Sequence, residues 1–309
     1  ISTKMPPKDV STLSRAAIKL FLNSFDTVLC DCDGVVWNLL NPIVGVKETL
    51  QTLRECGKKV HFVTNNSALG TKGIHDSLLE YDRQLQPTDV ITPAQTIIKY
   101  LKEFNFNKEI YILGTSSMKE DFQDAGFKLA KTKQQQTADS MEVLQEFLVD
   151  DESVGAVVCD YDIHLSNLKM IRCAVFLRRP DVLFILGATD KKLFVGNKLA
   201  LPGPHFYQAA LAEVTGRTPM AFGKPSPNLH NYITRALNIK DPSRVLFVGD
   251  SIASDIRFGS ACGFQTLLVF SGLAKLSDLK KIKNEQDTPN YYLDSFGDLC
   301  EIIKSRLEM

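Results

Sequence analysis

The 309-residue sequence lacks a long apolar segment and lacks a net charge. No stretch approaches the roughly 18 uninterrupted apolar residues that a membrane-spanning helix requires, so we expect a soluble protein with no membrane partner. Lysine and arginine together number 36, and so do aspartate and glutamate. Because there is no global field of either sign, the sequence does not favour nucleic acid as a partner. Any anion-binding site must be local.

The sequence also lacks a cysteine framework. Its seven cysteines are odd in number and follow no regular spacing, which favours free thiols in a reducing compartment. We expect the cytoplasm because no targeting signal is visible. Residues 11–25 predict a capped amphipathic helix, since Arg15 and Lys19 interrupt its apolar positions too often for a signal peptide. We base no fold prediction on the residues before Met5.

Short apolar runs rich in β-branched residues recur along the chain and alternate with helical patterns. They end at Cys30, Thr64, Gly114, Asp162, Asp190, Asp250 and Gly272. Strands that alternate with helices of roughly 10 to 15 residues predict an α/β fold, with a doubly wound, Rossmann-like parallel sheet. The length favours two domains, at roughly 150 residues each. Ligands of such sheets bind beyond the carboxyl ends of the strands, so polar residues there count most.

Four polar clusters fall at predicted strand ends. They are Asp31 and Asp33 with Gly34, the segment 64–67 ("TNNS"), the segment 223–227 ("GKPSP") and the segment 249–255 ("GDSIASD"). Two carboxylates as close as Asp31 and Asp33 repel each other at a buried strand end, and a cation relieves the repulsion. With Asp250 as a further oxygen ligand, an all-oxygen site favours Mg²⁺ over zinc.

The other donors around these acids indicate a phosphoryl site. Lys224 is a lone cation, and Thr64, Asn65 and Asn66 offer hydroxyl and amide donors. Together with Mg²⁺ they would form a small positive pocket that binds a phosphoryl group. Each cluster taken alone also fits an ordinary structural role: a turn with solvated carboxylates, a helix-capping loop, a proline-bounded loop or a strand end.

The four clusters together resemble a known family. "DCDGVVW", "FVTNNS", "GKPSP" and "VGDSIASDIRFG" are similar, in order and spacing, to motifs one to four of the haloacid dehalogenase superfamily. The resemblance runs from about Phe21 to Leu268. It is closer to the group of 4-nitrophenylphosphatases, phosphoglycolate phosphatases and pyridoxal phosphate phosphatases, which carry a C2-type cap between motifs two and three. Four independent loops would otherwise have to match one ordered template by chance.

The resemblance implies a role for each motif residue. Asp31 matches the nucleophile that forms an aspartyl-phosphate, and Asp33 matches the general acid and base. Thr64 matches a phosphate donor, with Asn65 and Asn66 beside it. Lys224 matches the lysine that steadies the nucleophile and the phosphoryl oxygens.

The resemblance also implies a metal site. Asp250 matches a Mg²⁺ ligand, joined by the Asp31 carboxylate and the Asp33 carbonyl. Asp255 matches a second acid of motif four that orients its neighbours. Gly34 lets the backbone turn closely at this point.

The cap is expected between two candidate hinges, "ITPAQ" (91–95) and "LALPGPHF" (199–206). We predict a first core part at 1–91, a C2-type cap at 92–203 and a second core part at 204–309. In the cap, Asp160 and Asn167 replace the glycine and the aromatic residue expected from the family. The cap governs substrate choice in this family, so the substrate is left open. By resemblance alone we expect a homodimer formed through the cap.

The sequence thus predicts a Mg²⁺-dependent phosphatase of small phosphomonoesters that acts through an aspartyl-phosphate. Two alternatives are a weakly active phosphate-binding pseudoenzyme and a phosphotransferase to an acceptor other than water. Asp190 ends a cap strand and is a weaker candidate for the site. His164 and Cys32 have more ordinary interpretations, as a surface histidine and a small buried hydrophobe, and Trp37 is expected to pack under the nucleophile loop.

Overall fold

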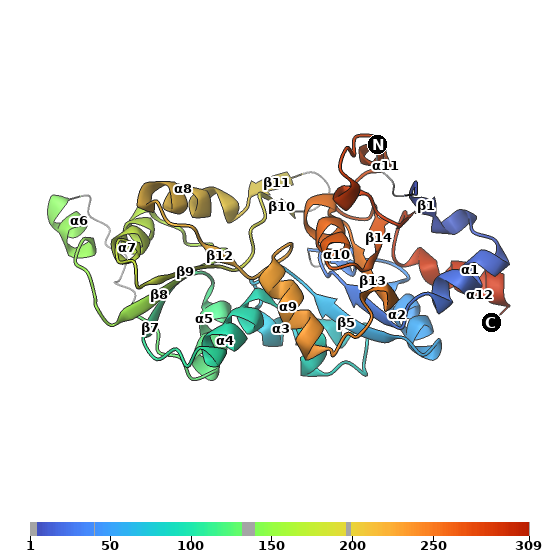
Figure 1. Ribbon diagram of the computed structural model, residues 1–309, viewed down its shortest axis with the longest axis horizontal. Coiled ribbons are helices and arrows are strands. Elements are labelled where there is room, and N and C mark those ends of the chain that lie inside the picture. Colours follow the sequence, from blue (N-terminus) through green and yellow to red (C-terminus); the bar gives the residue numbers. More distant parts are fainter. Residues whose placement is uncertain (1–4, 40, 132–139, 196–198, 309) are drawn as a thin grey trace.

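The computed structural model describes residues 5–39, 41–131, 140–195 and 199–308. It shows an elongated molecule with a cap of green and yellow segments at one end and a core of blue, orange and red segments at the other (Figure 1). In the described part of the chain, no helix combines the length and the apolarity that a membrane crossing needs.

The core contains a parallel sheet that has seven strands among the described residues. Their order is β1 (Lys8–Asp9), β15 (Tyr291–Leu293), β14 (Gln265–Val269), β13 (Val245–Gly249), β2 (Thr27–Cys30), β5 (Lys59–Val63) and β6 (Val90–Ile91). From β2 the chain builds outward through β5 and β6, and later outward through β13, β14 and β15 on the other side. The carboxyl ends of β2 and β13 therefore meet at the switch point, where a crevice opens.

Helices cover both faces of the core sheet. Val28 and Cys30 of β2 face one apolar cluster, and Leu29 faces the other. The first cluster includes residues of α1 (Arg15–Asn23), α2 (Val46–Glu55), α3 (Gly70–Leu78) and α12 (Asp298–Leu307), and the second includes residues of α9 (Pro227–Ala236) and α10 (Arg257–Ala261). Burial on both faces explains why these strands read as continuous apolar runs.

The cap has its own parallel sheet, in the order β12 (Met220–Ala221), β9 (Leu183–Leu186), β8 (Val154–Cys159) and β7 (Glu109–Leu113). Alternate side chains of its strands pack on α4 (Pro93–Glu103) and α5 (Ser116–Asp124) on one face, and on α7 (Asn167–Leu177) and α8 (His205–Thr215) on the other. Figure 1 shows these two pairs of helices below and above the cap sheet. The remaining elements are α6 (Met141–Phe147), the hairpin β10 (Lys192–Val195) with β11 (Leu199–Pro202), the hairpin β3 (Trp37–Asn38) with β4 (Asn41–Pro42), and α11 (Leu276–Leu279).

The α/β class and the doubly wound core predicted from sequence are confirmed. The first crossing into the cap follows β6, close to the expected hinge. The second expected boundary, near residue 203, falls before α8 and β12, and both of these elements belong to the cap, because β12 pairs with β9 and α8 packs in the apolar cluster of the cap. We therefore propose that the core resumes only after β12.

Candidate active site

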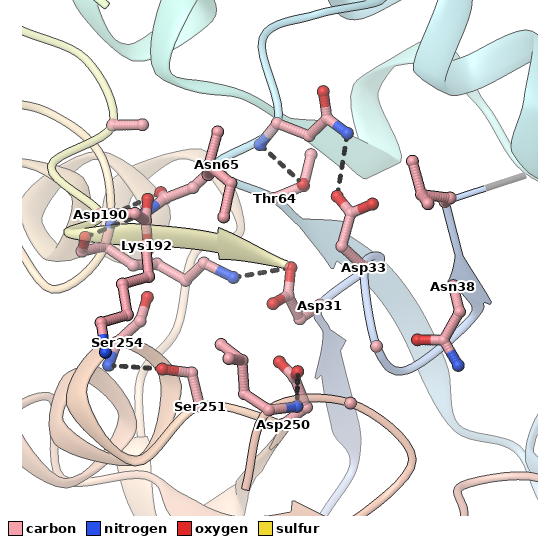
Figure 2. A pocket seen from close by; sticks show the side chains of 18 of the residues that line it. Asp31, Asp33, Asn38, Thr64, Asn65, Asp190, Lys192, Asp250, Ser251 and Ser254 are labelled. Atoms are coloured by element: carbon pink, nitrogen blue, oxygen red, sulfur yellow. Dashed lines mark hydrogen bonds and ion pairs between the residues drawn. The ribbon is translucent and has the colours of Figure 1, made fainter. Parts of the chain in front are cut away.

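The candidate active site is a cavity of about 630 Å³ between the cap and the carboxyl ends of the core strands. The loops after β2, β5, β13 and β14 line it from the core, and residues that follow β8 and β9 line it from the cap. Each of these loops follows a buried strand, so the rigid sheet positions the polar side chains. Figure 2 shows Asp31, Asp33, Thr64, Asn65, Asp190 and Asp250 around this space.

A buried lysine holds two of the predicted acids. Lys224 Nζ lies 2.7 Å from Asp31 Oδ1 and 2.8 Å from Asp255 Oδ1. The side chain of Lys224 is only 1% exposed and that of Asp255 is fully buried. Burial alone would lower the pKa of Lys224, but attraction by Asp255 and Asp31 outweighs it and raises that pKa above its usual range. The ammonium group therefore stays charged.

Asp33 lies apart from this ion-pair system and has two donors of its own. The indole Nε1 of Trp37 donates to Oδ1 at 3.1 Å, and Asn66 Nδ2 donates to Oδ2 at 2.9 Å. Burial raises the pKa of Asp33, and the two hydrogen bonds oppose that shift. Asp33 therefore keeps a proton more readily than an exposed aspartate, which suits a group that must protonate a leaving oxygen.

The loop after β5 places its three predicted donors differently. Thr64 Oγ1 accepts a hydrogen bond from the Asn66 backbone N–H at 3.0 Å. Asn65 Oδ1 accepts from the Lys224 backbone N–H at 2.8 Å, and its Nδ2 donates to the Lys224 carbonyl at 3.1 Å and to Asp190 Oδ2 at 2.8 Å. The amide of Asn65 is thus fully engaged. We infer that it positions Lys224, and that its side chain does not donate to a phosphate as the sequence suggested.

Carboxylate oxygens gather near the end of β13. One oxygen each from Asp31, Asp250 and Asp255 lie within 4.8 Å of one another, and all three residues are buried. Burial, followed by the charge of Asp255, raises the pKa of Asp250 to about 8. Lys224 supplies one positive charge against these carboxylates, so their negative charge is not balanced.

This donor set fits Mg²⁺, which prefers oxygen ligands and relieves the repulsion between carboxylates. Both oxygens of Asp255 already have donors, from Lys224 Nζ at 2.8 Å and the Ser251 N–H at 3.0 Å. We therefore assign metal binding to Asp31 and Asp250, and assign Asp255 to holding Lys224. The Asp33 carbonyl as a further ligand stays a prediction.

Glycines leave room for the Asp250 carboxylate. Gly34 has φ of +79°, and a Cβ placed on it would lie 2.2 Å from Asp250 Oδ2. Gly272 approaches the same oxygen from the opposite loop, where a Cβ would lie 2.0 Å away. Asp250 Oδ2 also accepts a hydrogen bond from the Leu273 N–H at 2.7 Å. Only glycine allows the backbone to pass this close to the acid.

The cap is joined to the loop after β5 by a buried carboxylate. Asp160 follows β8 and is fully buried. It accepts hydrogen bonds from Ser67 Oγ at 2.6 Å, from the Tyr161 N–H at 2.6 Å and from the Ala188 N–H at 3.1 Å. Thr115 Oγ1 of the cap donates to the Ser67 carbonyl at 2.8 Å. The cap is thus hydrogen-bonded to the loop that carries Asn66, and Asn66 in turn donates to Asp33.

Several lining residues were missed by reasoning from sequence. The cap contributes Tyr161 and Lys192, and the core contributes Asn38, Phe270 and Lys275. Lys192 and Lys275 follow the ends of apolar runs, and Tyr161 and Phe270 lie within the last residues of such runs, so the strand-end rule could have drawn attention to these four.

The structure also shows where the weaker candidates for the site lie. Asp190 lines the cavity, whereas His164 is exposed and is not part of the lining. Cys32 is fully buried. Trp37 packs under the nucleophile loop as expected, and its hydrogen bond to Asp33 was not predicted.

Known proteins are similar to this chain in sequence. Residues 28–128 match the family of haloacid dehalogenase-like hydrolases, and residues 221–299 match a HAD-hydrolase-like family. The chain is 30% identical to a 4-nitrophenylphosphatase of Schizosaccharomyces pombe over 288 residues, which cover 92% of this chain and 96% of the relative. It is 30% identical to phosphoglycolate phosphatase 2 of Arabidopsis thaliana over 297 residues, which cover 95% of this chain and 98% of that one.

A solved structure shows the same fold. The crystal structure of a 4-nitrophenylphosphatase from Thermotoga maritima has a TM-score of 0.76 at 23% identity, with 91% of this chain and 98% of that chain covered. The chain belongs to the haloacid dehalogenase-like hydrolase family. The prediction that it is a phosphoric monoester hydrolase related to 4-nitrophenylphosphatases and phosphoglycolate phosphatases is confirmed.

We expect Gly34→Ala to lose at least about a hundredfold in phosphatase turnover, because its Cβ would displace the Asp250 carboxylate. Gly57→Ala is the matched control, since Gly57 has a similar φ of +74° and no atom lies within 4 Å of a Cβ there. Both variants should lose about 1 kcal/mol of stability from backbone strain. Steady-state kinetics and urea unfolding of both variants test this, and equal turnover in the two would contradict it.

The stability of the protein should depend on the titration of Asp160. Burial raises the pKa of this carboxyl to about 6, although hydrogen bonds from Ser67, Tyr161 and Ala188 oppose the shift. Because the pKa of Asp160 is raised in the folded state, its contribution to the free energy of unfolding is present at low pH. That contribution is lost as the pH rises through about 6. The free energy of unfolding of the wild type, compared with that of Asp160→Asn, should therefore fall between about pH 4 and pH 7, by on the order of 3 kcal/mol. Urea unfolding across this range measures the difference, and a difference that stays constant with pH would refute the assignment.

Proposed function

We propose that this protein is a Mg²⁺-dependent phosphatase of small phosphomonoesters, with Asp31 as its nucleophile. The observation that carries the proposal is the ion-pair system in which Lys224 Nζ lies 2.7 Å from Asp31 and 2.8 Å from Asp255. It supports the proposal because it fixes one carboxylate at the mouth of the strand crevice, while Asp33 stands nearby with separate hydrogen-bond partners. A fixed nucleophile beside an independent proton carrier is what a two-step phosphoryl transfer requires.

In the first step, an oxygen of Asp31 attacks phosphorus and the bond from phosphorus to the leaving-group oxygen breaks. Asp31 Oδ1 is held by Lys224 and by the Cys32 N–H at 2.8 Å, whereas no donor reaches Oδ2 among the described residues. Oδ2 is therefore the oxygen free to attack. Asp33 gives its proton to the leaving oxygen, which departs as an alcohol.

In the second step, water attacks the aspartyl-phosphate on Asp31. Asp33, now a carboxylate, takes a proton from that water, the bond from phosphorus to the Asp31 oxygen breaks, and inorganic phosphate leaves. The hydrogen bonds of Asp33 to Trp37 and Asn66, at 3.1 and 2.9 Å, keep its carboxyl group oriented for both proton transfers.

The remaining charge is handled by fixed groups of the chain. When bound by Asp31 and Asp250, Mg²⁺ supplies positive charge against the phosphoryl oxygens. Lys224 neutralises part of the charge of Asp31, and Asp255 keeps Lys224 in place. Thr64 Oγ1 lines the cavity and accepts from the Asn66 N–H, which leaves its hydroxyl hydrogen free to donate to a phosphate. Such pre-oriented donors need no rearrangement as the charge develops.

The cap supports small esters as substrates. It forms a wall of a cavity of about 630 Å³, large enough for a small phosphorylated metabolite. The matched relatives are named for 4-nitrophenyl phosphate and phosphoglycolate, which are both small. The cap would exclude water during the transfer and move for release of the product. A homodimer formed through the cap stays a prediction.

Asp31→Asn tests the proposed chemistry. Release of inorganic phosphate from 4-nitrophenyl phosphate should require Mg²⁺ and stop with EDTA, and in Asp31→Asn it should fall at least about a thousandfold, because the amide is a far weaker nucleophile. Asp124→Asn, the same change at an exposed position of α5, is the control and should keep full activity. Circular dichroism would show that both variants are folded. Turnover by folded Asp31→Asn within tenfold of the wild type would overturn the mechanism.

A further inference from the structure

The cavity extends well beyond the space that a phosphoryl group needs. Next to the catalytic acids its lining is apolar, with contributions from Leu39, Leu193 and Phe270. Two cations interrupt this apolar part, Lys192 at the start of the cap hairpin and Lys275 in the core loop after β14. The two lysines come from different domains and line the same cavity.

Neither lysine has an acidic partner among the described residues. Lys224, at the bottom of the cavity, pairs with Asp31 and Asp255, whereas no ion pair involves Lys192 or Lys275 in the described chain. Asp278 lies in the helix that follows Lys275; its Oδ1 pairs with Lys281 at 2.9 Å, and its Oδ2 accepts a hydrogen bond from the Lys275 backbone N–H at 3.0 Å. Within the described residues, neither ammonium group therefore has a carboxylate in ion-pair contact.

None of the acids that line the cavity forms an ion pair with either lysine among the described residues. Asp190, which lies two residues before Lys192, accepts a hydrogen bond from Asn65 Nδ2 at 2.8 Å. Figure 2 shows Lys192 extending away from Asp190 toward the turn that carries Ser251 and Ser254, and all four of these residues line the cavity. A ligand with an anionic group at that end would meet the ammonium group of Lys192, and because Lys192 and Lys275 are both exposed, each ion pair should add only modestly to the affinity.

We propose that Lys192 and Lys275 form an anion subsite for the leaving group. The substrate is then a phosphomonoester whose leaving group carries a second anionic group, such as a carboxylate or a second phosphate, on a short body that is partly apolar. This inference rests on the proposed function, because it takes the phosphoryl group to lie at Asp31. Since one lysine belongs to the cap and the other to the core, such a substrate would also favour the docked position of the cap.

Binding of inert phosphonates tests the subsite separately from catalysis. Isothermal titration calorimetry in the presence of Mg²⁺ would compare 4-carboxybenzylphosphonate with benzylphosphonate, which differ only in the carboxylate. The wild type should bind the carboxylated compound about tenfold more tightly, the usual scale of one or two partly exposed ion pairs. The preference should shrink as salt is raised.

Variants assign the preference to the two lysines. Lys192→Ala and Lys275→Ala should each reduce it severalfold, and Lys192→Arg should retain it. Lys191→Ala is the matched control, since Lys191 is exposed and is not part of the lining. Equal affinity of the wild type for both phosphonates, or a preference that survives both alanine changes, would overturn the subsite.

Turnover is measured in parallel on phenyl phosphate, which lacks the carboxylate. Turnover of phenyl phosphate without a carboxylate preference in binding would refute the subsite and leave the phosphatase intact. A binding preference that depends on the lysines, in a protein that does not turn over phenyl phosphate, would support the subsite and refute the proposed function.

Discussion

The ion pair of Lys224 with Asp31 and Asp255 is the interaction on which the rest of the site depends. It joins the loops after β2, β12 and β13, which come from distant parts of the sequence, at a single buried ammonium group. Removing Lys224 would leave the buried carboxylates of Asp31 and Asp255 without their cation, which costs several kcal/mol. The amide of Asn65 is hydrogen-bonded to both the backbone N–H and the carbonyl of Lys224. The position of the nucleophile is therefore set by contacts that are independent of any substrate.

In the proposed mechanism, the same charges call for a metal ion and give the two aspartates of the first motif different roles. Asp31 belongs to the ion-pair system and lies close to Asp250, which has no cation of its own among the described residues. Asp33 is held instead by Trp37 and Asn66. The loop that carries Asn66 is hydrogen-bonded, through Ser67, to Asp160 and Thr115 of the cap. A displacement of the cap would thus act on the proton carrier through Ser67 and Asn66.

Much of this arrangement could be predicted from the sequence, for physical reasons. Strands buried on both faces are continuous apolar runs, so β2, β5, β13 and β14 were visible, and the acids that follow them had to converge at one edge of the sheet. The end that we propose for the cap was not visible, because β12 has only two residues, a run too short to be read as a strand. The amide of Asn65 and the lysines of the cavity depend on how the cap docks, and local sequence carries no signal for that.

Trapping of the covalent intermediate would test the central claim most directly. In Asp33→Asn, 4-nitrophenolate can still leave without a proton, but the attacking water has lost its base, so the aspartyl-phosphate should accumulate. Rapid acid quenching with Mg²⁺ and 4-nitrophenyl phosphate, followed by peptide mass spectrometry, would locate it. The account predicts one phosphoryl group on the peptide that contains Asp31. A phosphoryl group on another residue, or an unmodified protein that nonetheless releases 4-nitrophenol over many turnovers, would contradict it.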